Sequence, residues 1–114
     1  MLPSPNRLKG KKNFDKVKKE GRVFQSANFG VAVLKRGDKN PSRFGFIIST
    51  KISKAAVHRN RVLRALREAI RQNLKFFPLG YDLVFLTKKS ILTNTTDEIM
   101  KQVESFVRNV KISE

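Results

Sequence analysis

The chain contains no cysteine and no tryptophan, one histidine, and only nine acidic residues among 114. The absence of cysteine excludes disulfide bonds and thiolate metal ligands. No two of its carboxylates have the spacing of a two-metal nuclease site, and the chain lacks a Gly-rich phosphate loop and a Ser-His-Asp order. We therefore expect neither a catalytic residue nor a metal site on this protein.

Long apolar runs are also missing. No stretch approaches the roughly 20 apolar residues of a membrane-spanning helix, and the first residues lack the apolar segment of a secretory signal. We therefore expect a cytoplasmic protein without a membrane partner. Because 39% of the residues are hydrophobic and nine are Phe, the chain can still form a modest core.

Positive charge is what the chain has in excess. Its 25 lysines and arginines give a formal net charge of +16. Residues 1–75 hold 20 of these cations against four acids, whereas residues 76–114 hold five of each. This asymmetry is typical of a protein that binds a polyanion, and nucleic acid is favoured over a membrane surface.

Hydrophobic periodicity and turn residues predict alternating helices and strands. Residues 1–8, with Pro3 and Pro5, are expected to form a flexible basic arm. Phe29, Val31 and Val33 repeat with a period of two, as a strand requires. A helix is expected at about 13–20, capped by Asn13 and ended by Gly21. Strands are expected within 23–35 and 43–50, joined by a hairpin turn at 36–42. They are followed by a helix at about 53–76 with Ser53 as its N-cap, a strand at 81–89 and a helix within 93–109.

This order predicts an α/β sandwich in which three helices pack on a mixed sheet of about four strands. The strands before and after the helix at 53–76 are expected to be parallel, because a long helix between two strands forms a crossover. General rules favour a right-handed crossover. No linker or repeat divides the chain, so we expect one domain over residues 1–114. Its charge asymmetry makes nucleic-acid binding the expected role of that domain.

The helix at 53–76 carries an apolar stripe and an arginine stripe. Near its start, Arg59-Asn60-Arg61 is the sharpest feature, because guanidinium groups bind phosphates bidentately and a helix start adds free N–H groups. The alternative is a solvated charged face, and the charge asymmetry favours phosphate binding. The apolar stripe consists of Val62, Leu66, Ala69, Ile70 and Leu74, and the arginine stripe of Arg61, Arg64, Arg67 and Arg71.

The run K-I-S-K-A-A-V-H-R-N-R-V-L-R at residues 51–64 resembles the signature of the bacterial ribonuclease P protein component. That signature is K-x-x-x-x-A-x-x-R-N-R, followed by Ile or Val and then Lys-Arg, at the start of a long helix. The resemblance covers about residues 7–108. The other matches, in the family's order, are Arg7-Leu8 followed by Phe14, then Phe44-Gly45-Phe46 followed by Ser49 and Lys51, and then Tyr81-Asp82.

The resemblance implies a protein subunit that assists a catalytic RNA. In this family the RNA subunit, with Mg²⁺, removes the 5′ leader of precursor tRNA, and the crossover around the basic helix is left-handed. The protein would bind no cofactor alone and would be a monomer when free. The residues implied in binding the catalytic RNA are Lys51, Lys54, Arg59, Asn60, Arg61, Arg64 and Arg67. Those implied in binding the leader, in a cleft between the long helix and the sheet, are Arg7, Lys11, Lys12, Phe14 and Lys18.

The chain departs from the family pattern at three positions. Leu63 stands where the family commonly has Lys, which removes one cationic contact. Lys18 and Ala32 stand where aromatic residues are common. Base stacking in the cleft would therefore depend mainly on Phe14, whose alternative role is that of a core residue on a short amphipathic helix.

Three other classes of protein fit parts of the sequence. A structural RNA-binding protein, such as a ribosomal protein, fits the composition equally well. Only the context of Arg59-Asn60-Arg61 favours a ribonuclease P protein component over this class. A DNA-binding helix protein is disfavoured because a strand, not a short helix, precedes the basic helix. A metal nuclease is disfavoured by the scarcity of acids, and His58 is explained as a solvated helix residue.

Overall fold

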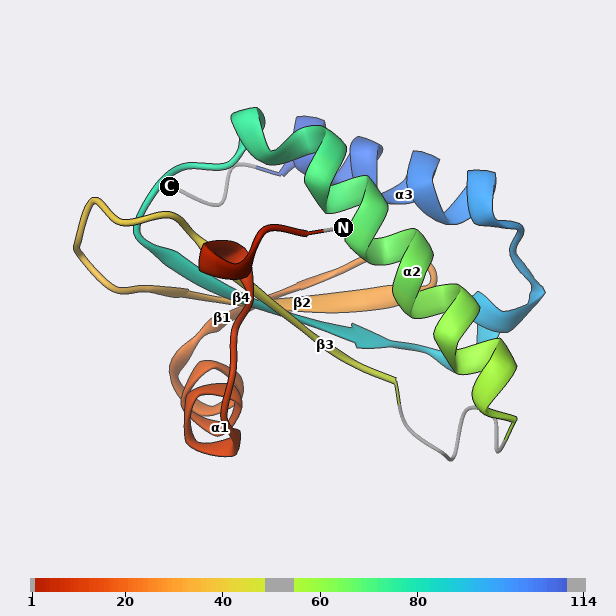
Figure 1. The fold of residues 1–114 in the computed structure, drawn as a ribbon, viewed down its shortest axis with the longest axis horizontal. Coiled ribbons are helices and arrows are strands. Elements are labelled where there is room, and N and C mark those ends of the chain that lie inside the picture. The colour runs from red at the N-terminus through yellow and green to blue at the C-terminus, as the bar shows by residue number, and fades with distance from the viewer. Residues whose placement is uncertain (1, 49–54, 111–114) are drawn as a thin grey trace.

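The computed structural model describes residues 2–48 and 55–110, which form one sheet with helices on both of its faces (Figure 1). The elements, in chain order, are η1 (Ser4–Asn6), α1 (Lys11–Glu20), β1 (Arg22–Gln25), β2 (Phe29–Lys35), β3 (Arg43–Ile47), α2 (Ala56–Asn73), η2 (Leu74–Phe76), β4 (Tyr81–Thr87), η3 (Lys89–Thr93) and α3 (Thr96–Asn109), where η denotes a 3₁₀ helix.

The sheet has four strands in the order β1-β2-β4-β3. Strand β2 is antiparallel to both β1 and β4, whereas β3 and β4 are parallel and are connected through α2. The predicted mixed sheet with three helices and the parallel crossover are therefore confirmed. The left-handed sense of the crossover stays a prediction.

The predicted hairpin between β2 and β3 is wrong. The segment at 36–42 does turn the chain, but β4 lies between the two strands and pairs with both. Strand β4 is buried over Tyr81–Phe85, and a strand with this continuous apolar run is stabilised in the centre of a sheet, where both faces are covered. The hairpin partner of β2 is β1.

Alternate residues of the strands face two separate clusters. Phe29, Val31 and Val33 of β2 join the main core with α2 and α3, as their period of two predicts. Ala32 of β2 faces a smaller cluster under α1 that includes Val17. Figure 1 shows α2 and α3 together on one face of the sheet and α1 on the other. The basic helix α2 and the helix that carries Phe14 therefore lie on opposite faces.

The N-terminal segment is packed on the sheet and is not the flexible basic arm that was predicted for residues 1–8. Leu2 and Leu8 are 1% and 5% exposed, and Leu8 N–H donates to the carbonyl of Phe44 at 2.9 Å. Arg7 forms a parallel bridge with Phe44 on the edge strand β3. The apolar side chains that flank Pro3–Arg7 tie this segment to the sheet, and this burial is the reason why the prediction fails.

The helix ends differ from the predictions by a few residues. Helix α1 begins after Gly10 at φ 89°, and the side chain of Asn13 donates to the carbonyl of Lys9 instead of capping the helix. The N-cap of α2 is Ala55, and the predicted cap Ser53 lies outside the described residues. Beyond Asn73 the predicted helix continues only as the 3₁₀ turn η2.

The start of α3 is fixed by reciprocal hydrogen bonds. The Thr95 hydroxyl accepts from the Glu98 N–H at 3.1 Å, and the Glu98 carboxylate accepts from the Thr95 N–H at 2.8 Å. These bonds satisfy two N–H groups that a helix start leaves open. Asp97 and Glu98 lie in the first turn, where the sequence analysis explained them by helix capping.

Candidate nucleic-acid interface

Helix α2 presents its polar side to solvent because its apolar stripe is buried. Val62, Leu66 and Ile70 are fully buried against the sheet and α3. Residues at the complementary helical positions face outward at intervals of three to four residues. Of these, Asn60, Arg64, Arg71 and Lys75 are exposed, and Arg67 is half-buried.

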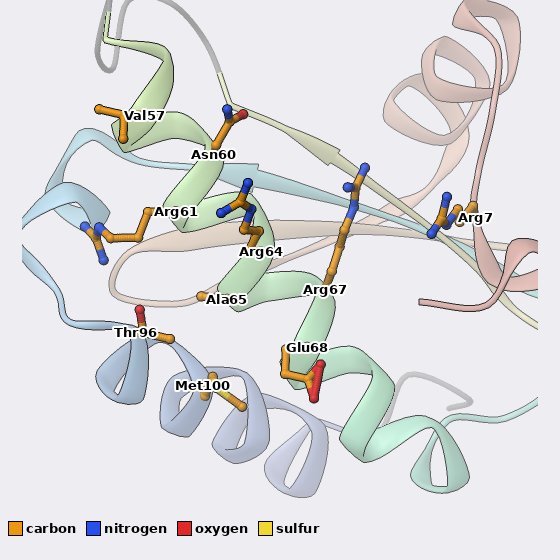
Figure 2. Close-up of a pocket in the computed structure, with 10 residues that line it drawn as sticks. All are labelled: Arg7, Val57, Asn60, Arg61, Arg64, Ala65, Arg67, Glu68, Thr96 and Met100. Carbon is orange, nitrogen blue, oxygen red and sulfur yellow. The ribbon is translucent and has the colours of Figure 1, made fainter. Parts of the chain in front are cut away.

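A groove of about 980 Å³ runs along this polar side. Figure 2 shows cationic side chains from α2 and the N-terminal segment around it, with Thr96 and Met100 from α3 on its other side. The sequence analysis missed Thr96 and Met100, because helical periodicity identifies a buried stripe but not the neighbouring helix. The lining residues are Arg7, Val57, Asn60, Arg61, Arg64, Ala65, Arg67, Glu68, Thr96 and Met100.

Arg61 differs from Arg64 and Arg67, which follow it on α2. Its Nη1 donates to the carbonyl of Asn94 at 2.9 Å, and its Nη2 donates to the carbonyl of Leu92 at 3.2 Å. These carbonyls belong to the end of η3 and the residue after it, so the guanidinium fastens α2 to the segment that leads into α3 (Figure 2). The second arginine of the Arg59-Asn60-Arg61 motif therefore has a structural contact that residue spacing does not predict.

Arg64 and Arg67 keep their charges available. Within the described part of the chain, neither guanidinium forms a hydrogen bond or an ion pair. The acidic residue of the groove, Glu68, accepts from Arg71 Nε at 3.0 Å, and this hydrogen bond, with the attraction of the guanidinium charge, lowers the pKa of Glu68. Because Arg71 neutralises Glu68, the groove keeps the excess positive charge of Arg64 and Arg67.

Phe14 lies on the other face of the sheet. Its half-buried ring rests on Gly45 of β3, and a Cβ atom at Gly45 would overlap the ring. A second groove, of about 280 Å³, crosses the edge strand β3 from this ring to α2. Its lining residues are Leu2, Arg7, Leu8, Lys9, Phe14, Phe44, Gly45, Phe46, Leu63 and Arg67.

This groove lies at the border of α2 and the sheet, where the cleft was expected, because its lining comes from α2 (Leu63 and Arg67) and from β3 (Phe44, Gly45 and Phe46). Directly beneath α2 the space is filled by buried side chains, so the groove opens across the edge strand β3. Binding of the leader there stays a prediction. Arg7 and Arg67 line both grooves, which makes the two grooves neighbours. Leu63 adds apolar surface to the groove at β3, where the family commonly has a cation.

The remaining predicted residues are distributed around these grooves. Lys11, Lys12 and Lys18 are exposed on α1 but do not line the groove at β3. Arg59 is half-buried near the start of α2. Lys51 and Lys54, predicted to contact the catalytic RNA, lie outside the described residues.

Nothing in the described ranges resembles a metal centre. Within the described residues 2–48 and 55–110, no three His, Asp or Glu side chains come close enough to hold an ion. The acids Asp82, Glu68 and Glu98 are each bound by partners of their own chain. In the same ranges, no helix is long and apolar enough to cross a membrane.

The fold and these two grooves define a small, basic α/β protein whose exposed cations suit an RNA partner. Comparison with known proteins identifies the family. The family model for Ribonuclease P matches residues 2–111, so the chain belongs to the ribonuclease P protein family.

Relatives and solved structures agree with this assignment. The ribonuclease P protein component of Clostridioides difficile is 38% identical over 113 residues, covering 95% of this chain and 96% of that protein. The component of Finegoldia magna is 36% identical over 104 residues, covering 91% of this chain and 86% of that protein. The RNase P protein of Thermotoga maritima has the same fold at a TM-score of 0.80 and 26% identity, with 92% of this chain and 97% of that one covered. The Staphylococcus aureus protein reaches a TM-score of 0.85 at 24% identity, with 96% and 98% covered.

Proposed function

We propose that this protein binds the RNA subunit of ribonuclease P and assists that RNA in removing the 5′ leader of precursor tRNA. The observation that carries the proposal is the open charge of Arg64 and Arg67 beside the Arg59-Asn60-Arg61 motif, in a chain of this family. Charge-assisted hydrogen bonds from guanidinium groups suit the phosphates of a folded RNA. Lys51 and Lys54 would extend the same contact.

The leader would bind on the Phe14 side. The Phe14 ring offers a stacking surface for an unpaired base, and Arg7 offers a charge for an adjacent phosphate in the same groove. The exposed Lys11, Lys12 and Lys18 of α1 would neutralise further phosphates. Because Arg7 and Arg67 line both grooves, the catalytic RNA and the leader would meet at the edge of β3.

The phosphodiester hydrolysis would belong to the RNA subunit and its Mg²⁺. The described residues of this chain do not fit a magnesium site, because Glu68 and Asp82 are engaged by arginines and Glu98 by the start of α3. The protein would act as one RNA-binding domain, monomeric when free and working in the cytoplasm.

Reconstitution tests this function. The protein is added to a bacterial ribonuclease P RNA and a precursor tRNA at low Mg²⁺, and leader release is measured. We expect faster leader release with the protein and none with the RNA-free protein alone. Specific cleavage by the RNA-free protein, or an unchanged rate with the RNA, would contradict the proposal.

A pair of charge-matched variants sharpens the test. Arg64→Ala removes an open charge from the groove, whereas Lys35→Ala removes an exposed charge from the end of β2. We expect Arg64→Ala to weaken binding of the catalytic RNA and Lys35→Ala to leave it unchanged. Equal losses of RNA affinity for the two variants would indicate that binding depends on net charge alone and not on the position of Arg64.

A further inference from the structure

The end of α2 exposes an aromatic ring that the proposed function does not use. Phe76 closes the 3₁₀ turn η2 and is 51% exposed. Its neighbour Phe77 is 9% exposed and packs edge-on against Phe44, with ring centroids 4.8 Å apart. The buried Phe77 holds the turn on the core, so Phe76 is presented from an anchored backbone and not from a free terminus.

Two cations lie against the Phe76 ring. Lys75 Nζ is 5.2 Å from the ring centroid, and Arg108 Cζ of α3 is 6.0 Å from it. Arg108 also bonds Glu104 at 3.1 Å, so its own charge is balanced locally, whereas Lys75 forms no ion pair within the described residues. The site therefore combines an aromatic face with cationic groups, which is the chemistry that holds an unpaired base and its phosphate.

The position of Phe76 continues the polar side of α2. Asn60, Arg64, Arg67, Arg71 and Lys75 recur every three to four residues, and Phe76 follows the last of them. At 1.5 Å per residue, the 13 steps from Asn60 to Asn73 span about 20 Å of the α2 axis, and Phe76 lies one 3₁₀ turn beyond. Figure 1 shows the C-terminal ends of α2 and α3 side by side at this end of the molecule.

We propose that Phe76, with Lys75 and Arg108, is a second RNA contact that stacks on an unpaired base of the RNA bound along α2. The inference rests on the proposed function, because the same RNA occupies the polar side of α2. An isolated exposed Phe is common on protein surfaces. Phe76 differs from Val23 and Leu79, which are similarly exposed, because it offers an aromatic face with two cations against it.

Tryptophan fluorescence tests the contact directly, because the chain has no tryptophan of its own. Phe76→Trp places one reporter in the site, and Val23→Trp places it at a similarly exposed control position on β1. The probe is a bacterial ribonuclease P RNA added to each variant, with excitation that excludes Tyr81. We expect quenching at saturating RNA for Phe76→Trp and little change for Val23→Trp.

Affinity measurements separate stacking from charge. Phe76→Leu keeps an apolar side chain but removes the ring, and we expect about tenfold weaker RNA binding with an unchanged salt dependence. Lys75→Ala should instead make the salt dependence shallower. Wild-type affinity for Phe76→Leu, together with no quenching of Phe76→Trp, would overturn the inference. If the unaltered protein fails to bind the RNA at all, the proposed function fails first, so the two failures are distinguishable.

Discussion

Arginines serve opposite purposes in two regions of this molecule. In the first, at the starts of β3 and β4, Asp82 is 4% exposed and accepts from Arg43 Nη2 at 2.6 Å and from Arg36 Nη1 at 3.0 Å. The hydrogen bond with Asp82 raises the pKa of Arg43. Arg36 also donates to Asp38 and to the carbonyls of Asn40 and Pro41, so this cluster shapes the connection between β2 and β3.

On α2, two arginines are left open. Arg64 and Arg67 line a groove, and nowhere in the described ranges does an acid or a carbonyl bind them. Arg61 lies between these cases, because its guanidinium is bound to backbone carbonyls although it belongs to the Arg59-Asn60-Arg61 motif, for which RNA binding is proposed. We therefore expect the partner of each arginine, more than its place in a motif, to separate a folding role from a binding role.

The largest effect is expected where the charges are paired. Asp82→Asn leaves the guanidinium groups of Arg36 and Arg43 without their shared acid and should lower the free energy of unfolding by about 3 kcal/mol, the low end for a broken buried pair because both arginines reach solvent. Denaturant unfolding measures the change. A loss near zero would show that the cluster does not stabilise the fold.

Arg61 gives the next largest effect. Arg61→Ala leaves the carbonyls of Leu92 and Asn94 without their donor and should lower the free energy of unfolding by about 1–3 kcal/mol. Arg61→Lys, which can donate to one of these carbonyls, should recover part of the lost free energy of unfolding. Thermal unfolding of Arg61→Ala, Arg61→Lys and Arg64→Ala measures these effects as changes in Tm. We expect an unchanged Tm for Arg64→Ala. A wild-type Tm for Arg61→Ala would show that the contacts of Arg61 with Leu92 and Asn94 do not stabilise the fold.

A variant of β3 tests the leader side without changing charge. Gly45→Ala should displace the Phe14 ring, because the new Cβ would overlap it. We expect the holoenzyme to lose about 1 kcal/mol of affinity for precursor tRNA, the low end of base stacking, and none for tRNA without a leader. The matched control is Gly30→Ala, whose Cβ would have the flexible side chain of Gln25 as its nearest neighbour. Equal losses with and without the leader would contradict a leader contact at Phe14.

The smallest effect concerns Glu98, an acid held mainly by hydrogen bonds at the start of α3. Hydrogen bonds from the Thr95 backbone N–H and hydroxyl lower the pKa of Glu98. A lowered folded-state pKa contributes stability above the unfolded value and loses it as the pH falls through the folded one. Glu98→Gln should therefore flatten the decline of Tm below about pH 5. An identical decline in both proteins would show that the capping box adds no pH dependence.

The sequence predicted the parts of the fold that depend on local periodicity. The buried stripe of α2, the period of two in β2 and the parallel crossover around α2 are confirmed. The position of β4 between β2 and β3 was not predicted, because strand pairing depends on burial across the whole sheet. The anchored N-terminus was missed because Leu2 and Leu8 show no pattern beside Pro3 and Pro5.

The candidate site was predicted in outline but not in its division of roles. The spacing of arginines predicted a charged side of α2, and the structure places Asn60, Arg61, Arg64 and Arg67 around one groove. The acceptors of Arg61 lie 33 and 31 residues further along the chain, in a segment that no local pattern connects to α2. Contacts of this range depend on how α2 and α3 pack.

The most direct test compares the salt dependence of RNA binding for Arg64→Ala and Arg61→Ala. Each phosphate contact contributes about 0.9 to the slope of log K against log salt for a duplex, and about 0.7 for a single strand. We predict that Arg64→Ala makes the slope shallower by about one unit or less, whereas Arg61→Ala, measured where it is fully folded, keeps the original slope. A wild-type slope for Arg64→Ala, or a shallower slope only for Arg61→Ala, would contradict the assignment of binding to the unpaired arginines of α2.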